Sequence, residues 1–226
     1  MDRIYLIAQL ENIKNAKREN RLRVAQLVLK NECLFPFLLE IVFENNNKTT
    51  IKAAWVLELV CEQQLDLLAP YLNYFTSNIS NLKNDSAVRA ISKICGFLAK
   101  SYSSKTSSII KKEVTSKHIE KIIEAGFDWL INEHKVAIKV YAMEHLYFFG
   151  ETKPWVKEEL QLIINEVYSN YNIVKKPEVT LEANPDDLSL NRIVELSKTP
   201  INRLSIGIQS FFDDDLISMN PNPSPT

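Results

Sequence analysis

Three cysteines, Cys33, Cys61 and Cys95, are the side chains best suited by type to metal ligation or nucleophilic chemistry. They stand 28 and 34 residues apart, whereas cysteine ligands of a metal or an iron–sulfur cluster usually occur in CxxC or CxxxC groups. Cys61 and Cys95 also lie inside apolar runs, where a cysteine acts as a small buried hydrophobe. The sequence therefore predicts no metal ligand.

The three histidines, His118, His134 and His145, are candidates for acid–base chemistry because imidazole titrates near neutral pH. None of them has an acid or base partner at a spacing that is typical of catalysis. All three stand within or beside helical patterns, which favours structural roles on helix surfaces or at helix boundaries. Residue types and spacing therefore predict no catalytic residue.

Basic side chains could bind nucleic acid at two places. One is a cluster near the N-terminus, formed by Lys14, Lys17, Arg18, Arg21 and Arg23. The other is a set of equivalent positions in three similar helices, occupied by Lys52, Arg89 and Lys139. The chain as a whole is balanced, with 27 basic and 28 acidic residues, so no bulk attraction to nucleic acid is expected. A HEAT-like nucleic-acid binder remains an alternative, although isolated basic residues at such positions often pair with a neighbouring acid.

The apolar pattern that must position these side chains is helical from residue 2 to about 170, because apolar residues recur at i, i+3, i+4 and i+7. Local polar and conformational signals break it. Thr49 or Thr50 is expected to cap one helix, and Thr115 another, with Glu120 placed to reach back. The sequence predicts helices near 2–16, 18–31, 35–45, 49–63, 66–81, 85–102, 116–133, 135–149 and 154–170.

Three of these helices open alike, with an apolar residue, a basic residue and then small or apolar residues. The shared openings begin at Ile51, Val88 and Ile138, which are 37 and 50 residues apart, and the Ser-rich stretch from Ser101 to Ser108 lengthens the second interval. Helix pairs that recur at such intervals are typical of HEAT and armadillo repeats. We predict a mainly α fold, a HEAT/armadillo-like α-α superhelix, with a non-repeating helical bundle as the alternative.

The runs KRENRLRVAQLVLKN, KAAWVLELVCE and DSAVRAISKICGFLA resemble a family of small, uncharacterised helical-repeat proteins of Bacteroidetes. The resemblance covers residues 1 to about 160. Members of that family are sometimes labelled adenylosuccinate lyase, but the Ser- and Gly-rich loop signature of that enzyme is not found in this sequence. The resemblance therefore implies a helical-repeat protein and no lyase activity.

A different pattern begins after Tyr171. The segments 177–185 and 201–211 alternate or concentrate apolar residues as strands do, and 187–198 between them has a helical pattern. Another short helix is expected at 213–219. A strand–helix–strand unit implies a parallel sheet with covering helices. We predict a helical domain over 1–160, a βαβ fragment over 161–221 and a disordered tail over 222–226.

The motifs TLEANPDDL, NRLSIGIQSF and DDDLISMN resemble the radical-SAM family of oxygen-independent coproporphyrinogen oxidases and the haem chaperone HemW. In that family these segments are neighbouring strands of a partial barrel. Glu182 and Gln209 match positions that contact S-adenosylmethionine in the family, so the resemblance implies a vestigial cofactor site at these two residues. Two polar residues at strand ends, with no ligand, are the alternative reading.

Two departures from the family pattern bear on catalysis. The CxxxCxxC loop that holds the [4Fe–4S] cluster is not in the sequence, and radical chemistry needs that cluster to reduce the sulfonium. Pro221 stands where the family usually has an arginine that faces the cofactor. We therefore expect no enzymatic activity and no bound cofactor for this chain; S-adenosylmethionine and the [4Fe–4S] cluster belong only to the family that it resembles.

The function predicted from the sequence is a non-catalytic scaffold that binds another protein on a concave helical surface. Aromatic side chains could serve there as interface anchors or belong to the core; they are Trp129, Tyr141, Tyr147, Phe148, Phe149 and Trp155. A radical-SAM haem-pathway protein that keeps part of the cofactor site is the alternative. No segment approaches the roughly 20 apolar residues of a membrane span, and the start has acidic residues within its apolar stretch, so a cytoplasmic protein is expected.

Overall fold

The computed structural model describes residues 2–45, 47–170, 178, 180–183, 190–197 and 202–206. The chain divides into two compact units, Met1–Glu166 and Val167–Thr226. The described residues are mainly helical, and the division falls inside one helix, Pro154–Asn170.

The first unit consists of helices joined by short turns. Its α-helices are α1 (Arg3–Glu11), α2 (Arg18–Lys30), α3 (Phe35–Phe43), α4 (Asn47–Gln63), α5 (Leu72–Asn78), α6 (Asp85–Ser103), α7 (Ile109–Glu113), α8 (Ser116–Ile131), α9 (Val136–Phe149) and α10 (Pro154–Asn170). Short 3₁₀ helices are η1 (Glu32–Leu34), η2 (Leu65–Tyr71) and η3 (Ile79–Asn81). The helix predicted over 66–81 is therefore η2, α5 and η3 in succession, because Pro70 cannot donate a backbone hydrogen bond inside a regular α-helix.

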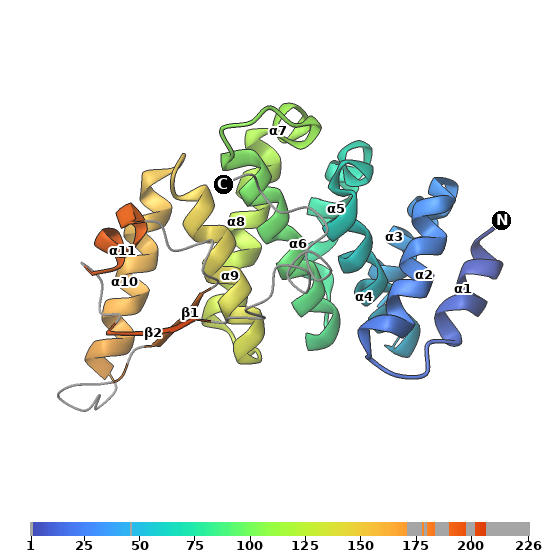
Figure 1. Cartoon of the computed structure of the whole chain (residues 1–226), viewed down its shortest axis with the longest axis horizontal. Coiled ribbons are helices and arrows are strands. Elements are labelled where there is room, and N and C mark those ends of the chain that lie inside the picture. Colours follow the sequence, from blue (N-terminus) through green and yellow to red (C-terminus); the bar gives the residue numbers. More distant parts are fainter. Residues whose placement is uncertain are drawn as a thin grey trace, which may run out of the picture. The chain divides into compact units, whose positions relative to one another are not determined.

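The helices of the first unit form two rows. Row A contains α2, α4, α6 and α9, each packed against the next. Row B contains α1, α3, α5 and α8: α1 and α3 pack on α4, α8 packs on α9, and α5 packs on α8 within the row. The helices follow one another across Figure 1 in chain order, from α1 in blue to α10 in orange. This two-row arrangement buries one face of every row A helix against its neighbours.

The hydrophobic core of the first unit runs between the two rows from Leu6 to Leu160. Aromatic contacts extend it along row B, where the Phe43 ring on α3 meets those of Tyr74 and Phe75 on α5 edge-on. Burial of this continuous apolar surface is the main stabilising contribution, because apolar area removed from water contributes roughly 25 cal/mol per Å².

Side-chain caps determine where several helices begin. The Asn84 carboxamide oxygen accepts a hydrogen bond from the Ser86 amide at 2.9 Å at the start of α6. Thr115 caps α8 as expected, but His118 closes the capping box instead of Glu120. The His118 ring reaches back because it stands at the third position of the helix, within hydrogen-bonding distance of the Thr115 amide.

The turn between α3 and α4 differs from its prediction. The α4 helix begins at Asn47, two residues before the cap expected at Thr49 or Thr50. Thr50 is buried instead, and its hydroxyl donates to the Ile41 carbonyl at 3.2 Å. Asn45 makes the tight turn, with a φ of 54° that asparagine tolerates better than most residues.

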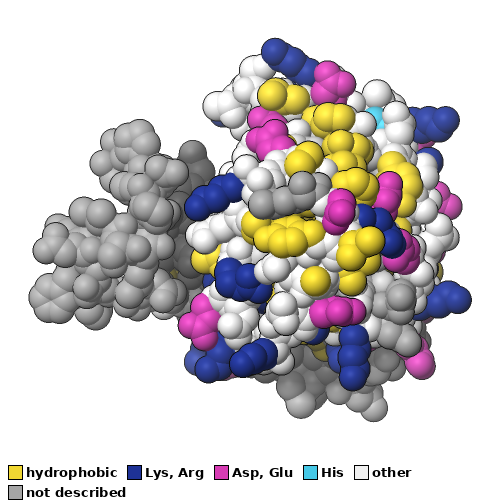
Figure 2. All heavy atoms as spheres, turned by 90° about the vertical axis from the view of Figure 1, so that its right-hand side faces the viewer, with side chains coloured by type: hydrophobic (Ala, Val, Ile, Leu, Met, Phe, Trp, Pro, Cys, Tyr) yellow, Lys and Arg dark blue, Asp and Glu magenta, His cyan; other side chains and the backbone are white. Residues whose placement is uncertain are grey.

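One end of the first unit exposes apolar side chains. Figure 2 looks at the end that lies on the right in Figure 1, and apolar side chains gather in the middle of this face with charges of both signs around them. On α1, which Figure 1 labels at this end, Ile4 is 77% exposed and Tyr5 37% exposed. No described helix of the chain is long and apolar enough to cross a membrane.

The described part of the second unit is a parallel strand pair with a helix between the strands in sequence. The elements are β1 (Thr180–Ala183), α11 (Leu190–Leu196) and β2 (Arg203–Ile206), all inside the ranges predicted for them. The strands pair in register from Thr180 with Arg203 to Ala183 with Ile206. The helix predicted at 213–219, Pro221 and the tail at 222–226 lie outside the described residues.

Candidate functional site

The two residues matched to a cofactor site fall on and beyond the strand pair. Glu182 lies on β1, where it pairs in register with Ser205 of β2. Gln209 lies outside the described residues, so the structure places one of the two. An exposed ion pair joins the Arg203 guanidinium to the Glu178 carboxylate at 2.6 Å. Both of these side chains are more than half exposed, so this pair contributes little to stability.

Two of the three histidines link neighbouring elements. His118 Nε2 lies 2.8 Å from the Asn73 carboxamide oxygen on α5, and burial lowers the pKa of His118, with Lys121 acting in the same direction. His134, in the turn before α9, lies 2.9 Å from the Asp85 carboxylate at the start of α6. Both rings therefore form polar contacts between helices, which is a structural role.

The third histidine, His145, is fully buried in α9. Its ring meets the Trp129 ring of α8 edge-on, with 6.0 Å between centroids. Neither ring nitrogen has a hydrogen-bond partner of normal geometry among the described residues, although backbone groups of Tyr141 and Ser92 lie close enough to favour the charged form. The neighbouring buried hydroxyl of Ser92 on α6 has no such partner among them either. Burial lowers the pKa of His145 to about 4, because the charged form loses its hydration. His145 is therefore neutral at physiological pH and part of the core.

The cysteines do not form a metal site within the described residues. Cys61 and Cys95 are buried in α4 and α6, and burial raises the pKa of both thiols. Cys33 is exposed on η1. No group of three or more His, Cys, Asp or Glu side chains with metal-binding geometry occurs in the part of the chain that the structure describes.

The most organised polar feature is a chain of ion pairs along row A. Glu58 on α4, with a side chain only 5% exposed, receives hydrogen bonds on both carboxylate oxygens. Arg89 donates to one oxygen at 2.8 Å and Lys93 to the other at 3.0 Å, both from α6. Arg89 and Lys93 are four residues apart, so they stand on the same side of that helix. A buried carboxylate is thus neutralised by two cations across the α4–α6 contact.

Further ion pairs lie to both sides of Glu58. Glu62 lies 3.6 Å from the Lys93 ammonium and 2.6 Å from the Arg18 guanidinium, which joins α2 to α4. At the other side, Lys100 of α6 pairs with Glu144 of α9 at 2.7 Å. Every contact between successive row A helices is therefore crossed by at least one pair of opposite charges.

The basic residues at equivalent positions in three helices have different environments. Arg89 is neutralised by Glu58, and the Lys52 ammonium donates to the Glu11 carbonyl at the end of α1 at 2.9 Å. Lys139 is half-buried on α9. Two of the three are thus engaged within the protein, which reduces the positive charge that they present to a ligand.

Cations also lie over aromatic rings of the first unit. The Arg21 guanidinium lies 5.8 Å from the centroid of the half-buried Trp55 ring, across the α2–α4 contact. Lys93 lies similarly over Phe97. Such pairs leave amphipathic aromatic surface at the edge of the solvent, and Trp, Tyr and Arg are the residue types enriched in interface hot spots.

The aromatic residues proposed from the sequence divide between core and surface. Trp129 and Phe149 are buried, whereas Tyr141, Tyr147 and Phe148 are half-buried and Trp155 is 48% exposed. Trp155 stacks on Phe127 of α8 at 6.1 Å. For the α9 aromatics the sequence could not separate the two classes, because apolar residues occur around most of that helix.

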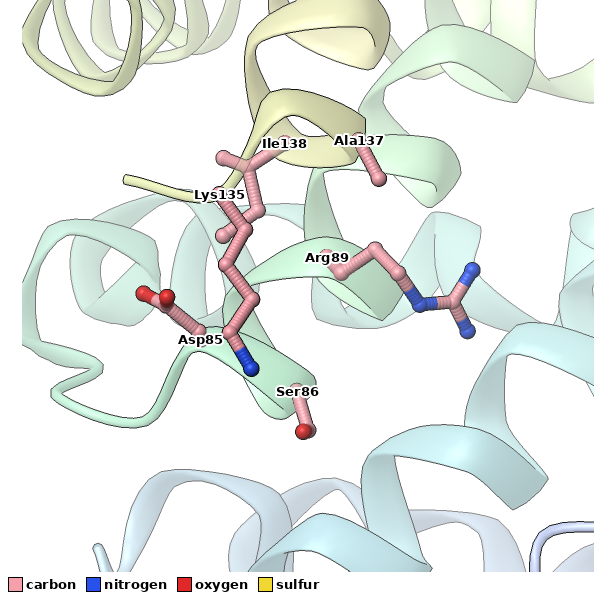
Figure 3. Close-up of a pocket in the computed structure, with 6 residues that line it drawn as sticks. All are labelled: Asp85, Ser86, Arg89, Lys135, Ala137 and Ile138. Atoms are coloured by element: carbon pink, nitrogen blue, oxygen red, sulfur yellow. The ribbon is translucent and has the colours of Figure 1, made fainter. Parts of the chain in front are cut away.

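A small pocket lies between the starts of α6 and α9 and is shown in Figure 3. Its volume is about 170 Å³, below the roughly 300 to 1,000 Å³ of small-molecule sites. The Lys135 ammonium points toward Ser86, but the Asp85 carboxylate and the Arg89 guanidinium point away from it on opposite sides. These charged groups do not converge, so the pocket has no arrangement suited to catalysis.

The chain resembles curated proteins over part of its length. Matches include haem chaperones named HemW from Buchnera aphidicola (30% identical over 123 residues, 54% of this chain and 30% of the relative), Bacillus subtilis (40% over 72 residues, 30% and 18%) and Escherichia coli (33% over 57 residues, 25% and 15%). No family model and no solved structure matches the chain.

The chain spans less than a third of the length of each of these relatives. The Buchnera alignment, at 123 residues, is longer than the whole second unit, Val167–Thr226, so it also includes residues of the first unit. The resemblance of residues 1–160 to Bacteroidetes helical-repeat proteins gains no support from these comparisons and stays a prediction. The comparisons therefore show that part of this chain is similar to part of HemW.

Proposed function

We propose that this chain is a non-catalytic helical-repeat scaffold, a HEAT/armadillo-like superhelix, that binds another protein along row A and carries a segment related to HemW. The observation that carries the proposal is the row A surface itself. Ion pairs cross every contact between its helices, and cation-covered aromatic rings lie beside them. The cations and carboxylates there pair with one another and do not converge on a common point.

Such a surface suits a protein partner better than a small molecule. Charged pairs that already neutralise each other keep the row rigid, so binding would cost little additional ordering. The partly exposed rings of Trp55 and Phe97 offer apolar area with a polar rim, the pattern of protein interfaces. The partner predicted is a protein, and nucleic acid remains the less favoured ligand.

The test compares truncations of one aromatic side chain in each row. Trp55→Ala removes the ring under Arg21 in row A, and Tyr74→Ala removes a 42% exposed ring in row B as the matched control. Proteins captured by the wild-type chain would be quantified by mass spectrometry against both variants. We expect at least a tenfold loss of a specific partner with Trp55→Ala only. Equal capture by all three chains would refute binding along row A.

A second function is favoured by the comparisons: a haem-pathway protein of the radical-SAM type. Three proteins named as haem chaperones match the chain at 30% to 40% identity. Glu182, a position implied to contact S-adenosylmethionine, lies on a parallel strand pair. The donor set for the iron–sulfur cluster does not fit, because the sequence has only Cys33, Cys61 and Cys95, and two of these are buried in helices.

Haem binding separates the two functions. Haemin would be titrated into the full chain and into residues 1–166, with the Soret band as the readout. A saturable spectral change that needs residues 167–226 would support the haem-pathway function. No spectral change in either protein would count against that function and favour the scaffold function. Anaerobic iron–sulfur reconstitution is the companion measurement, and we expect no absorbance near 400 nm because no cluster-binding cysteine motif is present.

A further inference from the structure

The α9 helix presents an apolar stripe to solvent. Val136 is 77% exposed, Val140 49% and Met143 38%, and the half-buried Tyr147 continues the line. Exposed charged and polar side chains normally occupy the outer side of a surface helix, so an apolar stripe of this length calls for a cover.

The spacing of the stripe suits a helix as its cover. The four residues are separated by four, three and four positions, which is the repeat of a coiled-coil seam. The opposite side of α9 is buried in the array, as Ile138, His145 and Phe149 are fully buried. The α9 helix therefore has two apolar sides, one packed against α6 and α8 and one exposed at Val136, Val140 and Met143. At the end of the exposed side, the Lys157 ammonium of α10 lies 5.1 Å from the centroid of the Tyr147 ring.

Charges beside the stripe indicate which helix fits. Lys139 lies on one flank and Glu144 on the other, five residues further along, which is the separation of residues that face each other across parallel paired helices. In a parallel pair of two α9 helices, Lys139 of one copy would meet Glu144 of the other, twice. An antiparallel pair would place Lys139 near Leu146 of the other copy and lose both contacts. Glu144 is 34% exposed beside Lys100, so it remains accessible to a second cation.

We propose that the α9 stripe is the interface for a second copy of this chain, in a parallel two-fold pair with Val140 facing its own counterpart. The contact is self-complementary and closes at two copies. It is separate from the surface around Trp55 assigned above to a protein partner, so failure of either proposal leaves the other standing.

Sedimentation velocity of the full chain over a wide concentration range tests the pairing, with reductant present because Cys33 is an exposed thiol. We expect a concentration-dependent species of twice the 26.0 kDa of one chain. Val140→Glu would place like charges in the seam and raise the dissociation constant at least tenfold. Ile109→Glu, at a 51% exposed position on α7, is the matched control and should leave the dissociation constant unchanged.

Disulfide trapping tests the orientation. In a Cys33→Ser background, Val140→Cys should form a covalent dimer on oxidation, since the same residue meets itself only in the parallel pair, and Ile109→Cys should not. A single-copy mass at every concentration would overturn the proposal and point to a cover from within the same chain. Species that grow beyond two copies and disappear with Ile4→Glu would also overturn it, in favour of an end-to-end contact with the apolar face in Figure 2.

Discussion

At the scale of single residues, buried polar groups in the first unit fall into two kinds. Glu58 is fully matched, with one cation on each carboxylate oxygen. His145 is buried with neither ring nitrogen bonded among the described residues. Removing one partner of a buried ion pair such as that of Glu58 lowers the free energy of unfolding, because the other charge is left unpaired. A buried polar group without a hydrogen bond, such as the His145 ring, already lowers it, and protonating that ring would lower it further.

The ion pairs of Glu58 with Arg89 and Lys93 predict that Glu58→Gln and Glu62→Gln, although the same chemical change, destabilise the protein to different extents. Glu58→Gln removes a buried negative charge and leaves Arg89 and Lys93 with no carboxylate between them. Hydrogen bonds to charged groups contribute about 1.5 to 3 kcal/mol, and partial exposure of both cations reduces this to a loss of about 2 kcal/mol. Glu62→Gln, at a more exposed pair, should cost about 0.5 kcal/mol or less. Urea unfolding followed by circular dichroism measures both; equal losses would contradict the role of Glu58.

His145 predicts a pH dependence of stability. Its pKa is about 4 in the folded protein and near 6.5 when unfolded, so the unfolded chain binds the proton more tightly. Above pH 6.5 the ring is neutral in both states and adds no pH dependence. The free energy of unfolding falls as the pH decreases from there toward 4, by about 3 kcal/mol in all.

The variant His145→Leu isolates that contribution from those of titrating carboxylates. Its free energy of unfolding should exceed that of the wild type by an amount that grows from pH 7 to pH 4. A constant difference between the two proteins over this range would show that His145 does not titrate between folded and unfolded states.

At the scale of elements, helix contacts depend on where side chains are small. The α8 and α9 helices approach closely at Gly126, where a Cβ atom would lie 2.4 Å from His145 Nε2 and 3.1 Å from Leu146. On α6, a Cβ atom at Gly96 would meet only the carboxylate of Glu144, at 2.9 Å. The first neighbours are held in the core, while the second is the end of a flexible side chain that is one-third exposed.

Alanine at these two glycines should therefore have opposite effects. Gly126→Ala overpacks the α8–α9 contact. Such changes typically destabilise by about 1 to 3 kcal/mol, which exceeds the stabilisation from the higher helix propensity of alanine. Gly96→Ala should stabilise by up to about 1 kcal/mol, because alanine favours helix over glycine and Glu144 can move. Thermal unfolding of both variants is the measurement. A higher midpoint for Gly126→Ala than for Gly96→Ala would mean that α8 and α9 do not approach as described.

At the scale of the whole molecule, the described core belongs to the first unit. Its buried hydrophobic residues begin at Leu6 and end at Leu160. In the second unit, the described side chains of α11 include Leu190, Ile193 and Val194, which are 79%, 41% and 50% exposed. A two-stranded parallel sheet also needs cover on its faces. The first unit therefore has the apolar burial required for independent folding.

Residues 1–166 expressed alone should consequently fold. We expect cooperative thermal unfolding with a midpoint within about 4 °C of the full chain, a shift that corresponds to roughly 1 kcal/mol or less for a protein of this size. Circular dichroism at 222 nm provides the comparison. Loss of cooperative unfolding in the shorter protein would show that residues 167–226 contribute to the core.

Helix periodicity, polar turns and caps such as Thr115 predicted most helices of the first unit to within a few residues, because these signals act between near neighbours in the chain. The same local reasoning missed the burial of Thr50 and the division of 66–81, where packing and Pro70 decide. It also could not tell the buried Trp129 from the exposed Trp155. Gln209 lies outside the described residues, so its proposed role stays a prediction.

Contacts between residues distant in the chain were decided by folding alone. Glu58 and Arg89 are 31 residues apart, and nothing in the pattern around either one names the other. Their pairing follows from the packing of α4 on α6, as the burial of His145 follows from the packing of α9 between α6 and α8. Sequence pattern indicates which side of a helix is apolar; only the assembled rows show which apolar side is already covered and which, on α9, is still exposed.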